Sequence, residues 1–272
     1  MSKVIVTVIC SAAIAGALAI VVRWGRLDSS FRAEEPGIAS AVRRLCVLEV
    51  SGIIAGALVG GLGSRLMMRI MAATSGAAAQ GRVTEADEIV GRVTQEGTVG
   101  LLLFVGIGFG LVGAMMLAVV GRFLFRRAWL GGMVLGILAL GIFARTDPLS
   151  PDNSDFTILS PVALAVGMIC ALFVLYGMTV VSLSARLERS FPRLEWKARS
   201  LVAYIPLLLL AFPPFPLAVL GAIGIGALCS QAPRLADAWR SPAVQAIGSV
   251  VVALAAIGAN IWLGFGIAEI LS

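Results

Sequence analysis

The chain has 272 residues, of which 59% are hydrophobic and only 13% are charged, and its mean hydropathy is +1.00. Globular proteins carry about 25% charged residues, so this composition excludes an ordinary water-soluble domain and predicts a protein whose main partner is the lipid bilayer. The formal charge of +6 does not indicate a nucleic-acid partner, because basic residues of membrane proteins gather in cytoplasmic loops and set the orientation.

Apolar stretches of the length that a bilayer requires recur along the chain. A helix that rises about 1.5 Å per residue needs roughly 20 apolar residues to cross about 30 Å of hydrocarbon. The pattern predicts an all-α, polytopic transmembrane helix bundle of about seven spans, with residues 1–272 as a single integral membrane domain. The predicted spans are residues 4–22, 45–70, 98–120, 128–144, 160–184, 200–230 and 243–265.

The sixth predicted span is broken by prolines. Pro206, Pro213, Pro214 and Pro216 fall within it, and proline kinks or ends a helix because it lacks the backbone N–H and its ring clashes with the preceding turn. The segment is either one kinked, tilted span or two half-helices that return the chain to the same side as a re-entrant hairpin. We favour the kinked span, because it needs no buried irregular backbone.

Loop charges predict an orientation. The segment 23–44 holds five arginines, the segment 122–127 three, and the segment 186–199 five basic residues. The positive-inside rule places these three loops in the cytoplasm. The acidic residues between 85 and 96 and between 147 and 155 then lie outside, together with the amino terminus. The expected location is a bacterial inner (cytoplasmic) membrane.

Small residues recur at every fourth position in the second and third predicted spans. Such a stripe lies on one helical face and lets two helix backbones approach closely in a membrane. We therefore predict a glycine zipper, which packs helices within one bundle or joins this chain to a second copy or to another membrane protein. The predicted helix-packing residues are Gly52, Gly56, Gly60, Gly106 and Gly110.

Charged residues near the predicted outer face form the candidate ligand site. Arg65 and Arg69 lie four residues apart on one helical face, where they can hold an anion such as a phosphate or a lipid headgroup. The alternative, which we favour, is that they snorkel to the interface or pair with acidic residues of the following loop. The candidate ligand-binding residues are Arg65, Arg69, Asp87, Glu88, Arg145, Asp152 and Asp155.

The loop after the second span contains its own turn signals. Thr84 followed by Asp87 fits a capping box that opens one or two helical turns, and Gly91 is placed to close them. The segment 147–155 is rich in oxygen ligands but lacks the acid spacing and central glycine of a calcium-binding loop. We interpret it as a turn before the fifth span and predict no metal site.

Missing residue types exclude several chemistries. The chain has no histidine, which rules out Ser-His-Asp and Cys-His nucleophiles, histidine-bound haem and the H-E-x-x-H zinc site. The only lysines, Lys3 and Lys197, lie in terminal or loop positions, and no phosphate-binding glycine loop is present. We predict no catalytic residues and no cofactor.

Polar residues within the spans are scarce. Glu49 lies near the expected cytoplasmic end of the second span and Asn260 near the expected far interface, so no carboxylate stands at the predicted midplane to carry protons or couple ions. The sequence predicts a non-enzymatic multi-pass protein, either an assembly or scaffold component of a membrane complex or a passive small-solute or lipid-binding subunit. The alternative is an intramembrane enzyme that acts on a lipid or isoprenoid substrate through outer-face carboxylates and arginines.

Overall fold

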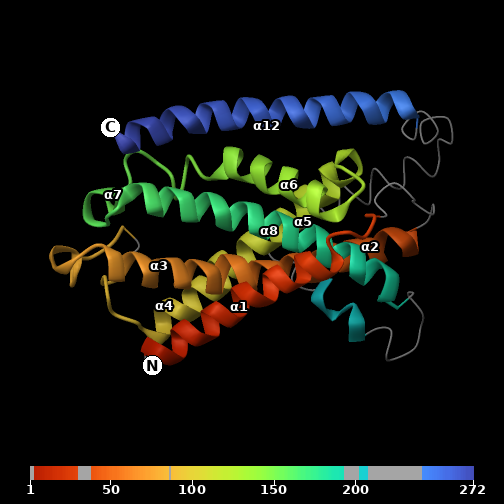
Figure 1. Cartoon of the computed structure of the whole chain (residues 1–272). Helices are drawn as coiled ribbons and strands as arrows, with labels where there is room; N and C mark the ends of the chain where they lie inside the picture. Colours follow the sequence, from red (N-terminus) through yellow and green to blue (C-terminus); the bar gives the residue numbers. More distant parts are fainter. Residues whose placement is uncertain (1–2, 30–37, 86, 193–201, 208–240) are drawn as a thin grey trace.

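A bundle of long helices makes up the structure, which is a computed structural model and describes residues 3–29, 38–85, 87–192, 202–207 and 241–272 (Figure 1). Within these ranges only two isolated bridges have β geometry. Five helices are long and apolar enough to cross a membrane: Val4–Trp24, Ala39–Thr74, Gln95–Phe123, Val162–Ser190 and Pro242–Leu271. A sixth apolar helix, Ala128–Phe143, is shorter. The predicted all-α polytopic bundle is confirmed.

The long helices are assembled from consecutive segments. The first is α1 (Lys3–Trp24). The second consists of α2 (Ile38–Ala55), the π-helical η1 (Gly56–Gly61) and α3 (Leu62–Thr74), and a short turn η2 (Ala77–Ala79) follows. The third consists of α4 (Gln95–Gly100), the π-helical η3 (Leu101–Gly108), α5 (Phe109–Val120) and η4 (Gly121–Phe123), and then come α6 (Ala128–Phe143), α7 (Asp155–Ile158), α8 (Val162–Ser190) and α12 (Pro242–Leu271).

Local capping explains where two of these helices begin. The hydroxyl of Thr94 accepts a hydrogen bond from the amide of Gly97 at 3.1 Å, and α4 starts at the next residue. Ser241 caps α12 in the same way by accepting from the amide of Val244 at 3.3 Å, with Pro242 in the first turn. Both arrangements satisfy backbone N–H groups that a helix start would otherwise leave unpaired.

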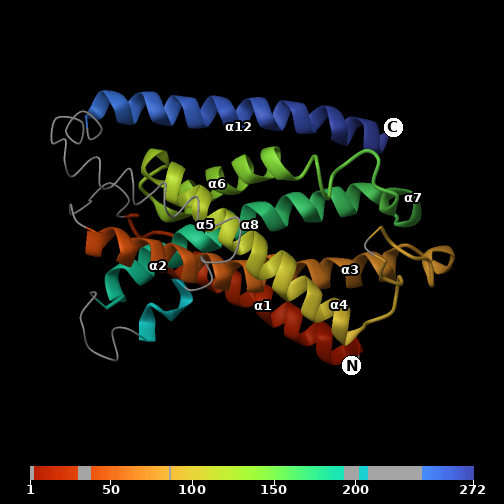
Figure 2. The same cartoon turned by 180° about the vertical axis from the view of Figure 1, so that it is seen from behind.

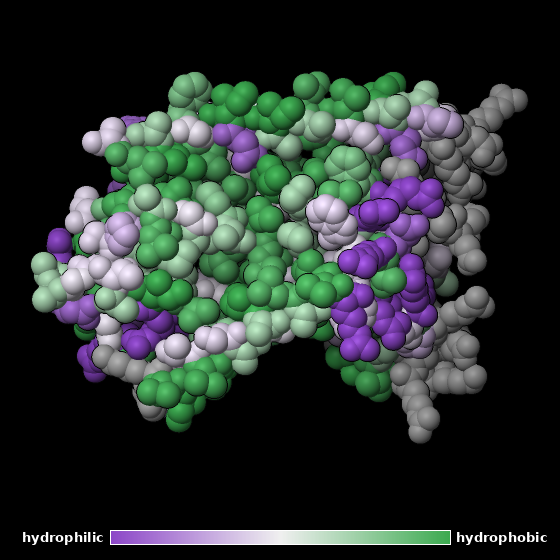
Figure 3. All heavy atoms as spheres, viewed as in Figure 1, coloured by the Kyte–Doolittle hydropathy of each residue, from purple (hydrophilic) through white to green (hydrophobic). Residues whose placement is uncertain are grey.

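Charged residues collect at the two ends of the bundle, and apolar side chains cover the face between them (Figure 3). One end, which we call the basic end, holds the start of α2, the segment 121–127 and the end of α8. There Arg43 donates to the carbonyls of Glu188 and Phe191, and Arg126 lies 3.8 Å from Asp28. The opposite end holds both termini of the described chain and the segments 75–94 and 144–161 (Figures 1 and 2). We call it the loop end.

The end of α8 and the start of α12 lie at the same end of the bundle. Near the end of α8, Arg189 donates to the carbonyl of Asp28 at 3.4 Å. Near the start of α12, Gln245 donates to the carbonyl of Arg122 at 2.8 Å. Both contacts lie at the basic end (Figure 1). The predicted kinked span and its re-entrant alternative fall on residues 200–230, most of which lie outside the described residues.

The five predicted packing glycines meet at one crossing, where α4–η3–α5 runs obliquely over α2–η1–α3 (Figure 2). A methyl group built at Gly56 would overlap the carbonyl oxygen of Gly106, and one at Gly110 would lie 2.5 Å from the carbonyl oxygen of Gly52. Gly60 is looser, because its methyl group would stand 3.2 Å from the Val105 oxygen. At Gly52, Gly56 and Gly110 the two backbones touch, and a side chain as small as alanine does not fit.

Two π-helical segments face each other at this crossing. η1 and η3 pack together and contain Gly56, Gly60 and Gly106. A π-helix is wider than an α-helix and is rare outside single turns inside α-helices. The sequence stripe predicts the contact but not this change of helix type, because glycine favours neither form by itself.

A second backbone contact joins α6 to α8. A methyl group at Gly132 would lie 2.5 Å from the carbonyl oxygen of Gly177, and one at Gly136 would lie 2.5 Å from that of Phe173. Next to this contact, the hydroxyl of Tyr176 donates to the carbonyl of Gly110 at 3.0 Å and so ties α8 to the first crossing. The short α6 is thereby held inside the bundle.

Candidate anion-binding pocket

A small pocket of about 90 Å³ lies at the loop end, between α3, the loop 76–94 and the segment around α7. Its charged lining comes from three separate stretches of the chain, and methionine and aliphatic side chains of α3 and the loop complete it. The charged lining residues are Arg65, Arg69, Glu88, Arg92 and Asp155. Four of the seven predicted ligand-binding residues therefore converge on one pocket.

Arg65 is the most buried charged group of this site. Its side chain is only 3% exposed, although it lies on the third turn from the end of α3. One nitrogen, Nη2, donates to the carbonyl of Thr94 at 3.3 Å. Its Nε atom is buried and has no hydrogen-bond partner. A buried guanidinium with an unused donor is costly, so its presence demands an explanation beyond helix packing.

Arg69 stands one turn further along α3 and repeats the pattern. Its Nε atom is also buried and without a partner. The expected ion pairs with the acidic loop are not found: in the described part of the chain, the carboxylates of Asp87, Glu88 and Glu96 form no salt bridge with Arg65 or Arg69. The two guanidiniums share one helical face, as their spacing predicts, and both line the same cavity.

Glu88 reaches the pocket through a hairpin-like turn rather than the predicted helical turn. The amide of Thr84 donates to the carbonyl of Glu88 at 2.9 Å, and Val83 forms a bridge with Ile89. Asp87, at the tip, has a φ of 56°, the left-handed conformation of a turn residue, and its side chain is exposed. The capping-box prediction is thus wrong, and of the two adjacent carboxylates only Glu88 faces the arginines.

Thr94 contacts both a basic and an acidic residue of this site, Arg65 and Glu88. Its hydroxyl lies 3.3 Å from both carboxylate oxygens of Glu88, and its carbonyl accepts from Arg65. The Glu88 carboxylate also packs against Gly97 in the first turn of α4. A negative charge there is stabilised by the dipole of the helix. The carboxylate is therefore held in place beside the arginines without neutralising them.

Asp155 belongs to the same pocket, and its neighbour Asp152 does not. Asp155 begins α7 and accepts a hydrogen bond from the amide of Glu85 at 2.9 Å, which fixes the loop against α7. The hydroxyl of Ser75 adds a second tie, because it accepts from the amide of Ser160 at 2.9 Å. Asp152 is exposed and lines no part of the pocket.

Arg145 has a structural role away from this site. Its guanidinium carbon lies 4.6 Å from the ring centroid of Trp262, and Nη1 donates to the carbonyl of Trp262 at 3.1 Å. This cation–π contact joins the segment after α6 to α12. Asp87, Arg145 and Asp152 are thus the three predicted ligand-binding residues that the structure separates from the other four.

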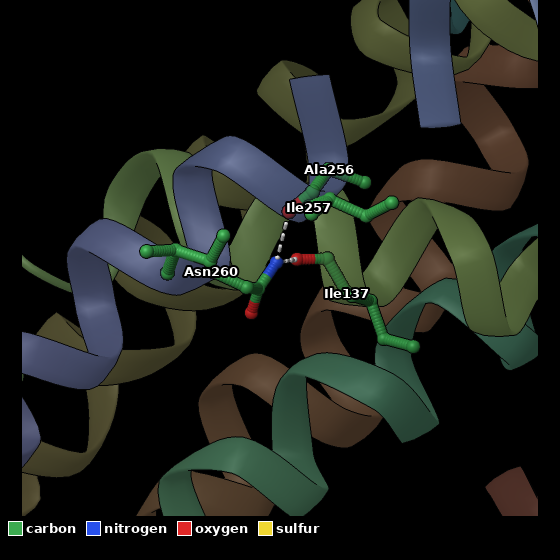
Figure 4. A pocket seen from close by; sticks show the side chains of 5 residues that line it. Ile137, Ala256, Ile257 and Asn260 are labelled. Carbon is green, nitrogen blue, oxygen red and sulfur yellow. Dashed lines mark hydrogen bonds between the residues drawn. The ribbon is translucent and has the colours of Figure 1, made fainter. Parts of the chain in front are cut away.

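A second cavity, an open crevice of about 390 Å³, lies between α6 and α12 (Figure 4). Four aliphatic side chains line it together with Asn260, whose Nδ2 donates to the carbonyls of Ile137 and Ala256, each at 2.8 Å. Ile137 is in the middle of α6, and Asn260 therefore meets that helix about halfway along its length. Its amide is used to join two helices.

Glu49 is buried much more completely than its place near a span end suggests. It is 1% exposed, and neither carboxylate oxygen has a hydrogen-bond partner. The sequence shows the acidic residue but not its burial, which depends on the helices packed around α2. It lies in the half of the long helix Ala39–Thr74 that is nearer the basic end, and it takes no part in the pocket.

No metal cluster and no relative accounts for the pocket. Across the described ranges, no group of three or more His, Cys, Asp or Glu side chains could hold a metal ion. Comparisons of the chain with models of protein families, with curated proteins and with solved structures give no match. Chemical interpretation of the site therefore rests on its own geometry.

Proposed function

We propose that this protein is a non-enzymatic multi-pass membrane protein that binds a lipid headgroup through a phosphate in the pocket at its loop end. The observation that carries the proposal is the pair of guanidiniums, Arg65 and Arg69, that line one pocket and form no salt bridge with its carboxylates; each has a buried Nε atom without a hydrogen-bond partner. Guanidinium groups recognise phosphate by two parallel hydrogen bonds. A bound phosphate would supply hydrogen-bond acceptors for these guanidinium groups.

The position of the pocket supports a lipid rather than a large solute. Arg65 and Arg69 lie near the end of an apolar helix of 36 residues, Ala39–Thr74, at the level where lipid headgroups meet the hydrocarbon. Methionine side chains of α3 line the cavity beside the arginines. A ligand there would place its charged group on the arginines and its apolar part toward the membrane.

The orientation and the association of the chain belong to the same proposal. The segregation of basic side chains at one end supports a cytoplasmic basic end and an outward loop end, with an inner-membrane location. The glycine zipper is proposed to act within the chain, because Gly52, Gly56, Gly106 and Gly110 already contact each other across one crossing. A homo-oligomer or a partner protein would require a different face, and nucleic acid has no part in the proposal.

A lipid-binding assay on detergent-purified protein tests the proposal. Soluble dioctanoyl phospholipids should raise the melting temperature of the delipidated protein, since a ligand that binds only the folded state stabilises it. Arg65→Met and Arg69→Met should each weaken the half-maximal response at least about tenfold, the effect of losing one charge-assisted hydrogen bond. Arg82→Met is the matched control, because Arg82 is an exposed loop arginine outside the pocket lining.

An unchanged lipid response in both pocket variants would overturn the proposal. Size-exclusion profiles separate loss of binding from loss of folding, and Arg69→Met is the safer variant because Arg69 is only half-buried. With both variants folded, a response that persists would mean that lipid stabilises the protein through its general apolar surface.

One observation favours an enzyme as the second candidate. Glu88 and Asp155 line the same pocket as the arginines, as an intramembrane enzyme with a phosphate-bearing lipid substrate would require. Such an enzyme should release product from a lipid or isoprenoid phosphate, and Glu88→Gln should abolish that release without weakening binding. Intact substrate after long incubation with folded protein would eliminate this candidate.

A further inference from the structure

The pocket contains charges of both signs that do not neutralise one another. Arg65, Arg69 and Arg92 line it together with Glu88 and Asp155, and none of these arginines forms a salt bridge with either carboxylate. A site for a fully ionised phosphate monoester would place no carboxylate beside it, because like charges in a small cavity repel. The two carboxylates therefore favour a ligand that also carries a positive charge.

We infer that the ligand is a zwitterion with a phosphate and a primary ammonium group, the chemistry of the phosphoethanolamine headgroup. The inference rests on the proposed function, and it goes further by assigning Glu88 and Asp155 to the ammonium. The phosphate accepts from the guanidinium groups of Arg65 and Arg69, which line the pocket. The ammonium donates to the two carboxylates, and one ligand bridges groups that the chain leaves apart.

Both carboxylates have hydrogen-bond acceptor positions left for the ammonium group. Asp155 accepts one backbone hydrogen bond, from Glu85, through Oδ1. Glu88 is approached by the single hydroxyl of Thr94. An ionised carboxylate has about four lone-pair sites, so both groups retain free acceptor positions. An ammonium with three N–H donors matches two such acceptors, whereas a trimethylammonium group has none to offer.

The two kinds of charge come from different segments around the cavity. Arg65 and Arg69 belong to α3, whereas Glu88 belongs to the loop residues 88–93 and Asp155 to α7. A headgroup bound in the cavity can therefore contact an arginine through one group and a carboxylate through another.

The test compares headgroups that differ in one feature. Titration of the delipidated protein with dioctanoyl phosphatidylethanolamine, phosphatidylcholine and phosphatidylglycerol, read by melting temperature, should rank the ethanolamine lipid at least about tenfold tighter than the other two. Glycerophosphoethanolamine, which lacks acyl chains, distinguishes a free solute from a membrane lipid as the source of this headgroup: binding equal to that of the lipid indicates the solute, and weaker binding the lipid.

Variants separate this inference from the proposed function. Glu88→Gln with Asp155→Asn should remove the preference for ethanolamine while retaining a response to all three lipids. Asp152→Asn, an exposed carboxylate three residues from Asp155, is the control. A preference for phosphatidylglycerol, or an ethanolamine preference that survives the double variant, would overturn the inference and leave the arginine site standing. Loss of arginine dependence for every lipid would overturn both.

Discussion

The glycine crossing and the arginine pocket are built on the same two long helices and differ in what they leave unsatisfied. At the crossing, Gly56 and Gly106 bring two backbones into contact, and the carbonyl of Gly110 accepts a hydrogen bond from the hydroxyl of Tyr176. Nine residues beyond Gly56, Arg65 is buried with a donor unused. The first region packs backbone against backbone, whereas the second contains a buried polar atom without a partner, an arrangement that is expected at functional or strained sites.

The largest expected effect is a loss of stability at the glycine crossing. Gly56→Ala should destabilise the protein by about 3 kcal/mol or more, because the added methyl group meets backbone that cannot rotate away. Gly167→Ala is the matched control: a methyl group there meets nothing within 4 Å, and alanine favours a helix over glycine. Unfolding in a denaturing detergent measures both. Equal stability of the two variants would show that the close approach is not required.

A substitution in the pocket should instead increase the stability of the protein. Without lipid, Arg65→Met should stabilise the protein by about 1–3 kcal/mol, since exchanging a buried, poorly paired charge for an apolar side chain of similar length removes a desolvation cost. The melting temperature of delipidated protein measures the effect, and Arg82→Met should leave it within about 0.5 kcal/mol of the wild type. A less stable Arg65→Met protein would mean that the guanidinium supports the fold and is not held for a ligand.

The smallest expected effect comes from removing one hydrogen bond beside the glycine crossing. Tyr176→Phe removes the hydrogen bond to the Gly110 carbonyl and should destabilise the protein by about 1 kcal/mol. Lipid binding should not change, because Tyr176 is outside the pocket lining. A shift in lipid affinity with this variant would show that the two regions are coupled through α5 rather than independent.

Much of the architecture could be predicted from periodic and compositional features. Six of the seven predicted spans correspond to apolar helices in the described part of the chain, five long ones and the shorter α6, because burying backbone in hydrocarbon requires helices of sufficient length. The glycine spacing identified the residues of the crossing, since only a small residue at every fourth position leaves a smooth face. The spacing of Arg65 and Arg69 placed both on one helical face.

Long-range connections could not be predicted in this way. From sequence, Asp87 and Glu88 are equivalent acidic neighbours, as are Asp152 and Asp155, and only the hairpin around Asp87 and the start of α7 decide which carboxylates face the arginines. Thr94, which contacts both Arg65 and Glu88, looks in the sequence like an ordinary loop threonine. Its role arises because the chain returns to α3 after the loop.

The position of α12 is a second feature that depends on long-range contacts. Local sequence rules describe what proline does to a helix, but they do not say where the next helix packs. Which end of the bundle α12 starts from depends on its contacts with Arg122 and Phe123, more than a hundred residues earlier in the chain. The sequence by itself determined a membrane helix bundle and its close-packing faces, because these follow from the solvent and from local periodicity. The tertiary structure alone decided the topology at α12 and the mixed-charge pocket, because both depend on contacts between distant segments.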